Sequence, residues 1–177
     1  MKKKLIALIS FLCYIICWVQ AADEHYYFKN LSIQDGLSQT TVNAIIQDKK
    51  GFMWFGTKGG LNRYDGMLFR NFKHDMTDNH SLGNNFVTCL YQDNNGNIWV
   101  GTDAGVYIYY SDQEIFIPFD RLSRENTKIE RTVSAISGDK QGRVWIAVET
   151  QGLFCYEPQK DRLYNYTSVS YTHLRAH

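Results

Sequence analysis

Three aspartates recur at matched positions of this 177-residue chain, and carboxylates can bind metal ions or transfer protons. They are Asp48, Asp93 and Asp139, and each begins an Asp-x-x-Gly segment. A calcium loop would place several oxygen ligands within about twelve residues and end in glutamate, and none of the three segments continues that way. Aspartate at the first position of a turn accepts backbone N–H bonds, and glycine at the fourth position tolerates a positive φ. We therefore predict turn caps, with calcium binding or catalysis as the alternative.

A second set of charged residues lies in loops that occupy comparable places along the chain. Asp103 and Glu149 are the acids of this set, and Lys58 takes the same place earlier in the sequence. Acids that face a common opening would suit a glycosidase or lyase, which uses a pair of carboxyl groups. Solvated loop charge is the simpler interpretation, so we expect no catalytic residue and keep an exported carbohydrate-active enzyme as the alternative.

Aromatic side chains are abundant, with 12 Tyr, 10 Phe and 4 Trp. Trp54, Trp99 and Trp145 could stack on sugar rings or pack in a core. Their regular spacing favours packing between repeated units.

Metal and cofactor sites are not expected. No CxxC pair or His-Cys cluster occurs, so the pattern typical of a zinc site is missing from the sequence. Beyond the N-terminal apolar run the cysteines are Cys89 and Cys155, which we predict to be small buried thiols, although an exported protein could oxidise them. The net charge of +1 argues against nucleic acid as a partner.

The first 21 residues have the pattern of a secretory signal peptide. Three lysines precede the apolar run of residues 5–19, and Ala21 and Ala22 follow it. A membrane anchor is the alternative, but the run is shorter than the roughly 20 residues of a span. A lipoprotein anchor at Cys17 is less favoured, because bulky Ile16 precedes it. We expect export with cleavage after Ala21.

A repeat of about 45 residues organises the chain that follows. The three tryptophans are separated by 45 and 46 residues, and other positions keep the same spacing. Three sets precede the tryptophans: the valines Val42, Val87 and Val133, the three aspartates, and the glycines Gly51, Gly96 and Gly142. Two sets follow the tryptophans: the glycines Gly56 and Gly101, and the tyrosines Tyr64, Tyr109 and Tyr156. In the third copy Ala147 replaces the glycine that follows Trp, and Val148 replaces the threonine of Thr57 and Thr102.

Such a period fits two or three helices, or four short strands. Each copy contains four short β-rich runs separated by Gly and Asp/Asn clusters, and none sustains an apolar 3.6-residue period. We therefore predict an all-β chain with about three propeller blades of four antiparallel strands in an incomplete ring. The expected ranges are a signal peptide (1–21), an N-terminal closing strand and lead-in (22–41), three blades (42–86, 87–132 and 133–167) and a linker or non-native truncated tail (168–177).

The segment LSIQDGLSQTTVNAIIQDKKGFMWFGTKGGLNRYDG resembles the first repeat of the two-component-regulator propeller, and the likeness extends over about residues 26–166. The resemblance implies the N-terminal periplasmic sensor part of a Bacteroidetes-type hybrid two-component histidine kinase, with a membrane helix and kinase further along the protein. It implies an oligosaccharide ligand, control of glycan-utilisation genes, further blades and a homodimer partner, and no direct contact with nucleic acid. It transfers no ligand-binding residue, and a free-standing propeller for protein contacts is a further alternative.

Overall fold

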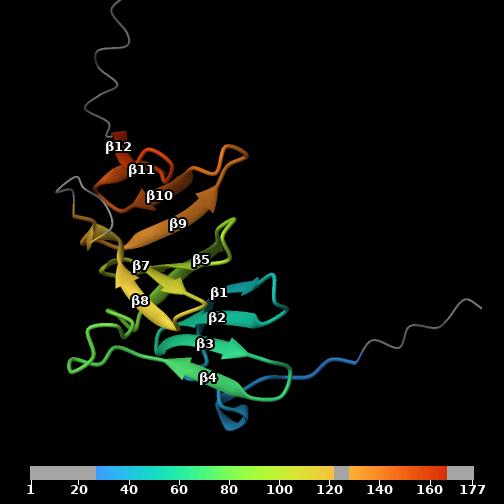
Figure 1. Cartoon of the computed structure of the whole chain (residues 1–177). Helices are drawn as coiled ribbons and strands as arrows, with labels where there is room; N and C mark the ends of the chain where they lie inside the picture. The colour runs from blue at the N-terminus through green and yellow to red at the C-terminus, as the bar shows by residue number, and fades with distance from the viewer. Residues whose placement is uncertain (1–26, 122–127, 167–177) are drawn as a thin grey trace, which may run out of the picture. The chain divides into compact units, whose positions relative to one another are not determined.

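Three four-stranded antiparallel sheets make up the described part of the protein (Figure 1). The computed structural model describes residues 27–121 and 128–166, so the predicted signal peptide and the segment 168–177 lie outside the described part. All the elements below belong to one compact unit that starts at Leu31. Within the described ranges, no helix is long and apolar enough to cross a membrane. The prediction of an all-β chain with three blades in an open ring is confirmed.

Each sheet keeps its strands in chain order, and we call the sheets blades 1 to 3. Blade 1 contains β1 (Val42–Gln47), β2 (Met53–Thr57), β3 (Gly60–Tyr64) and β4 (Phe69–Phe72). Blade 2 contains β5 (Val87–Gln92), β6 (Ile98–Thr102), β7 (Gly105–Tyr110) and β8 (Ile115–Pro118), and the 3-10 turn η2 (Phe119–Arg121) follows it. Blade 3 contains β9 (Val133–Gly138), β10 (Val144–Val148), β11 (Gly152–Glu157) and β12 (Arg162–Tyr166).

The antiparallel order gives every blade two distinct ends. The turns between the first and second strands and between the third and fourth strands lie at one end, which we call the turn face. The hairpin between the second and third strands lies at the opposite end, together with the connection to the next blade. The three Asp-x-x-Gly segments therefore share the turn face.

The first strand of each blade carries a β-bulge directly after its first valine. In blade 1, Val42 pairs with Thr57 and Ala44 pairs with Gly56, so Asn43 is the additional residue. Thr88 is the additional residue of blade 2, and Ser134 has the same place in blade 3. A bulged residue loses its own ladder partner and its side chain is redirected.

The redirected side chains join neighbouring blades. Asn43 Nδ2 donates a hydrogen bond to the Val87 carbonyl at 2.8 Å, and Thr88 Oγ1 donates one to the Val133 carbonyl at 2.5 Å. The bulge thus lets the first strands of blades 1 and 2 bond to the first strand of the next blade.

The predicted closing strand of the lead-in has no last blade to pair with among the described residues, so it stays a prediction. A closing strand was expected near residues 26–31, but the described residues 27–31 form none. An extended segment becomes a strand only when its backbone pairs with a neighbour, and each described strand pairs within its own blade. The short helix η1 (Ile33–Asp35) follows instead, and beyond it the Ser38 N–H donates to Asn62 Oδ1 at 2.8 Å.

Candidate functional site

The repeated aspartate of blade 1, Asp48, closes its turn and also binds the tryptophan. Asp48 Oδ1 accepts bonds from the backbone N–H groups of Lys50 and Phe52, both at 2.9 Å. Asp48 Oδ2 accepts a 2.7 Å bond from Trp54 Nε1. Gly51 has a φ of 91°, which the turn requires and glycine adopts without strain. One carboxylate therefore satisfies two turn N–H groups and a buried indole.

The same arrangement recurs in blades 2 and 3. Trp99 Nε1 donates to Asp93 Oδ2, and Trp145 Nε1 donates to Asp139 Oδ2, both at 3.0 Å. In blade 3, Arg143 Nε also donates to Asp139 Oδ2 at 2.6 Å. The Trp145 indole, together with Arg143, lowers the pKa of Asp139 to about 2. Sequence reasoning missed the Asp–Trp bond, although the constant six-residue spacing was its signal.

The glycines that follow the tryptophans lie where the next blade approaches. A Cβ atom built on Gly56 would lie 2.6 Å from Val87 Cγ1, and one built on Gly101 would lie 2.9 Å from Val133 Cγ1. Real carbon atoms do not approach so closely. Val87 therefore requires glycine at position 56, and at position 101 glycine is required by Val133 together with Cys89 of the same blade, whose Sγ would lie still closer to the added Cβ. Ala147 has the equivalent place in blade 3.

Aromatic side chains fill the gaps between blades. Tyr109 of blade 2 has its ring centroid 5.1 Å from that of Trp54 and 5.3 Å from that of Phe72, both in blade 1. Tyr156 of blade 3 contacts Trp99 at 6.0 Å and Phe119 at 5.1 Å in the same manner. Burial raises the pKa of Tyr156 to about 12. These rings pack between blades and are not arranged as a sugar platform.

The described residues offer no metal centre. Among them, no group of three His, Cys, Asp or Glu side chains is arranged to hold a metal ion. Cys89 and Cys155 are both free thiols, and burial raises the pKa of each. A raised pKa disfavours the thiolate, so neither is an activated nucleophile.

The charged loop residues that could suit a carbohydrate-active enzyme make other contacts. Asp103 Oδ1 accepts a 2.7 Å bond from Thr132 Oγ1, which ties the hairpin of blade 2 to the lead-in of blade 3. Lys58 Nζ lies 5.4 Å from the centroid of the Phe86 ring. Glu149 is exposed, and its backbone N–H donates to the Thr132 carbonyl at 2.9 Å. Asp103 and Lys58 thus contact the lead-in of the following blade, whereas the bond of Glu149 lies within blade 3 and its own lead-in.

A polar cleft lies on the turn face where blades 1 and 2 meet, and we call it the turn-face cleft. Its volume is about 210 Å³. The Lys49 backbone N–H donates to Gln92 Oε1 at 3.0 Å, and Lys49 Nζ donates to the Asn94 carbonyl at 2.8 Å, so one blade's turn is bonded to the next. Apart from Gly96, all the lining residues have polar side chains; they are Asp48, Lys49, Lys50, Gln92, Asn94, Asn95, Asn97, Ser111 and Asp112.

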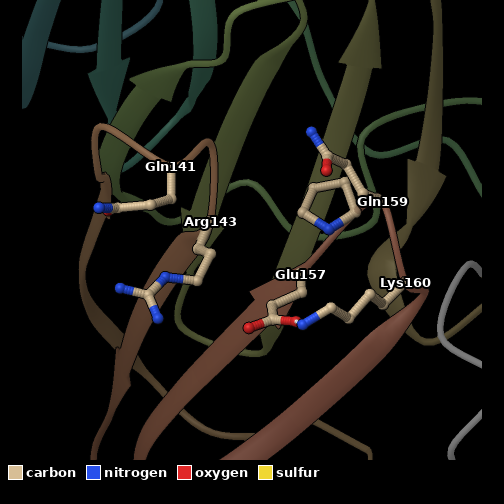
Figure 2. A pocket seen from close by; sticks show the side chains of 6 residues that line it. Gln141, Arg143, Glu157, Gln159 and Lys160 are labelled. Atoms are coloured by element: carbon tan, nitrogen blue, oxygen red, sulfur yellow. Dashed lines mark ion pairs between the residues drawn. The ribbon is translucent and has the colours of Figure 1, made fainter.

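Blade 3 has a separate pocket on its own turn face (Figure 2). It has a volume of about 220 Å³ and lies between the β9–β10 turn, with Gln141 and Arg143, and the β11–β12 turn, with Gln159. Glu157 Oε2 forms an ion pair with Lys160 Nζ at 2.9 Å. Arg143 is engaged with Asp139 and also lies 5.3 Å from the centroid of the Trp145 ring. The charged groups of this pocket are therefore already paired with each other or with neighbours.

Comparison with known proteins agrees with the repeat geometry. Residues 36–59 and 81–104 match the family described as two component regulator propeller. A histidine kinase from Formosa agariphila, named histidine kinase P4, is 38% identical over 77 residues, which cover 44% of this chain and 5% of that protein. The chain thus spans only a small part of the kinase to which it is similar.

Solved structures give the same assignment. The extracellular domain of the hybrid two-component system BT3049 from B. thetaiotaomicron matches 80% of this chain with a TM-score of 0.72 and 26% identity, over 20% of that domain. The extracellular domain of BT4673 from the same organism matches 73% of the chain and 19% of that domain, with a TM-score of 0.60 and 21% identity, and so shares the fold. The chain therefore has a propeller-like fold similar to the extracellular domains of hybrid two-component systems. Its predicted resemblance to the two-component regulator propeller is confirmed.

Proposed function

We propose that this chain is part of the extracellular sensor region of a hybrid two-component histidine kinase, and that the sensor responds to an oligosaccharide. The observation that carries the proposal is the match to the extracellular domain of BT3049 over 80% of the chain. The predicted signal peptide supports it, because a sensor of extracellular ligands must be exported. The turn-cap and packing roles of the repeated Asp and Trp residues leave no catalytic group among them.

The turn-face cleft supports a ligand rich in hydroxyl groups. The side-chain amides of Asn94 and Asn95 carry both donors and acceptors, and sugar hydroxyls require both. The ion pair of Lys50 with Asp112, 3.6 Å apart, balances charge at the rim, so the cleft has no strong preference for an ion. Its volume is below the roughly 300 Å³ of the smallest drug-sized sites, so it fits one end of a saccharide chain.

The position of the cleft suggests how binding could be communicated. Its walls come from the first turns of two blades, and a ligand that contacts both turns favours the arrangement in which they are close. A ligand shifts an equilibrium by the difference in its affinity for the two states. In the complete receptor, that difference would be transmitted to the kinase as a change in domain arrangement.

Binding can be measured by titration calorimetry of the exported protein against a panel of plant, host and microbial oligosaccharides. We expect one glycan class to bind, and we expect Asn95→Ala to weaken its affinity roughly fivefold, the effect of one lost hydrogen bond. The Asn95 backbone N–H that caps the turn is retained in this variant, so the fold should not change.

Gln141→Ala is the matched control. Gln141 occupies the same turn position in blade 3 and likewise caps its turn through its backbone N–H. If no glycan in the panel binds, the proposal that the sensor responds to an oligosaccharide is wrong. If Gln141→Ala weakens binding and Asn95→Ala does not, the pocket of Figure 2 is the site and the turn-face cleft is excluded.

A further inference from the structure

We propose that Arg63 and Arg70 bind the carboxylate of an acidic sugar, and that this carboxylate takes the place that Glu114 holds in the structure. The site lies near the turn face, where blade 1 meets blade 2. Its residues are distinct from those of the turn-face cleft. The inference rests on the proposal that the sensor responds to an oligosaccharide, and it adds the class of ligand: a saccharide that contains a uronic acid.

The two arginines set blade 1 apart from the other described blades. Arg63 pairs with Trp54 on β2 and with Arg70 on β4, so both arginines lie on the face of the sheet that blade 2 covers. The same ladder positions hold Ile108 and Ile117 in blade 2, and Cys155 and Tyr164 in blade 3. A blade of this design therefore forms without a cation at either position.

Glu114 of blade 2 supplies the carboxylate that the two arginines share. Its Oε1 lies 2.7 Å from Arg70 Nη1 and 3.3 Å from Arg63 Nη1. The side chains of Glu114 and Arg70 are 41% and 51% exposed, so their ion pair borders solvent and contributes little to stability. The planar fork of an arginine matches any carboxylate, so a carboxylate from a ligand can replace that of Glu114 at small cost.

Tyr109 provides a second hydrogen-bond donor for the Glu114 carboxylate. Tyr109 is fully buried, and within the described residues its hydroxyl has no hydrogen-bond partner. A buried donor without an acceptor is costly, so an acceptor that reaches this hydroxyl is stabilised there. Burial, and then the charge of Glu114, raise the pKa of Tyr109. The hydroxyl therefore keeps its proton and lies close enough to interact with that carboxylate.

Blade 3 shows the arrangement that Glu114 would adopt after exchange. Tyr156 and Asp161 occupy the places of Tyr109 and Glu114 in the repeat, and both acids have a left-handed backbone, with φ of 50° at Asp161 and 55° at Glu114. The Tyr156 hydroxyl donates to Asp161 Oδ1 at 3.2 Å. Glutamate is one methylene longer than aspartate, so Glu114 released from the arginines reaches the Tyr109 hydroxyl in the same way.

A pocket of about 270 Å³ beside the arginines has room for a sugar ring. Phe52 and Leu68 give it apolar surface, and the Asp65 carboxylate can accept a bond from a sugar hydroxyl. Arg63 is held over the Phe52 ring, 4.8 Å from its centroid, so one donor is positioned before binding. Two arginines and Asp65 leave one positive charge, which Glu114 balances in the structure and a uronic acid would balance in the complex.

NMR titration of the exported protein at constant ionic strength tests the site. The probes are the methyl glycosides of galacturonate and glucuronate, and those of galactose and glucose are neutral controls with the same rings. The side-chain Nε–H signals of Arg63 and Arg70 report where a probe binds. We expect at least one uronate to shift both signals and to bind roughly tenfold more tightly than its neutral counterpart, which corresponds to one charge-assisted hydrogen bond. Arg70→Gln should remove this preference.

Three variants test the exchange of carboxylates. Glu114→Ala removes the internal competitor and should tighten uronate binding roughly two- to fivefold. Tyr109→Phe removes the second partner of Glu114 and should weaken binding roughly two- to fivefold, but it should have no effect in the Glu114→Ala background. Asp161→Ala is the matched control, because it removes the acid at the same place in blade 3 and should leave uronate binding unchanged.

Circular dichroism melts of every variant identify any change that comes from loss of folding. Uronates that bind wild type no better than the neutral sugars, or that shift neither arginine signal, would overturn the inference. Equal effects of Tyr109→Phe with and without Glu114 would also overturn it. If neutral oligosaccharides bind at the turn-face cleft and no uronate binds at the arginines, this inference is wrong and the proposed function stands; if no glycan binds at all, both are wrong.

Discussion

Replacing Asp48 by asparagine should destabilise the protein through one specific contact. The new side chain keeps an oxygen for the two turn N–H groups, which Asp48 Oδ1 accepts at 2.9 Å. Its amide NH₂ then faces Trp54 Nε1–H, 2.7 Å away in the native protein, so that two donors oppose each other. Trp54 is 1% exposed, and water cannot take the place of the lost acceptor.

The magnitude follows from the type of bond. A hydrogen bond to a charged acceptor contributes about 1.5–3 kcal/mol, and a buried donor left without a partner costs about 1–3 kcal/mol. The two values describe largely the same loss, so they are not added. We expect Asp48→Asn to lower the free energy of unfolding by about 3 kcal/mol. Urea unfolding followed by far-ultraviolet circular dichroism measures this value without relying on the fluorescence of Trp54.

A double-mutant cycle with Trp54→Phe isolates the bond. Phenylalanine has no donor, so Asp48→Asn should cost only about 1 kcal/mol in that background, which leaves a coupling of about 2 kcal/mol. If Asp48→Asn costs the same amount with and without the indole, then the Asp–Trp bond does not stabilise the blade and the reasoning is refuted.

Three further effects follow from the contacts within and between blades. Gly56→Ala should lower stability by about 1–3 kcal/mol through overpacking on Val87, and Val87→Ala should recover part of the loss in chemical unfolding experiments. The pKa of Asp139 is lowered from 3.8 to about 2 in the folded protein, so the ionised carboxylate stabilises the fold at any pH above about 4, and this stabilisation is lost as the pH falls from about 4 to 2. The difference in melting temperature between wild type and Asp139→Asn should therefore narrow over that pH range and be constant above it. Glu114→Gln removes the 2.7 Å ion pair with Arg70 across blades 1 and 2 and should cost less than about 1 kcal/mol, with a smaller effect in high salt; a large, salt-independent loss would contradict this.

The strands and turns could be predicted because they depend on local sequence. The spacing between Val42 and Trp54, with Asp48 between them, is enough to place two strands and a turn, and its recurrence predicts the blades. The close packing of Val87 on Gly56 could also be predicted, because a glycine repeated two residues after each tryptophan indicates that another chain segment lies close to the backbone there.

The contacts between blades could not be predicted in the same way. The hydrogen bond from Asn43 to the Val87 carbonyl depends on a β-bulge, which no residue type announces. The pairing of Arg70 with Glu114, 44 residues apart, depends on the angle between two sheets. The turn-face cleft has the same origin, because its walls come from different blades.

The expected closing strand within residues 22–41 illustrates a different limit. An apolar, β-rich sequence near residues 26–31 predicted it, but a strand also needs a partner edge that local sequence does not provide. Here the lead-in is held by side-chain bonds, such as that of Asn71 Nδ2 to the Gly36 carbonyl at 3.0 Å.

The gene gives the most direct test of whether this chain is part of a hybrid two-component sensor. A continuous read of the genomic locus beyond codon 177 would show what the reading frame encodes next. We predict further tryptophan-centred repeats, then a membrane-spanning segment and a histidine kinase. A frame that leads into a catalytic carbohydrate-active domain, or that stops without any kinase, would contradict the account.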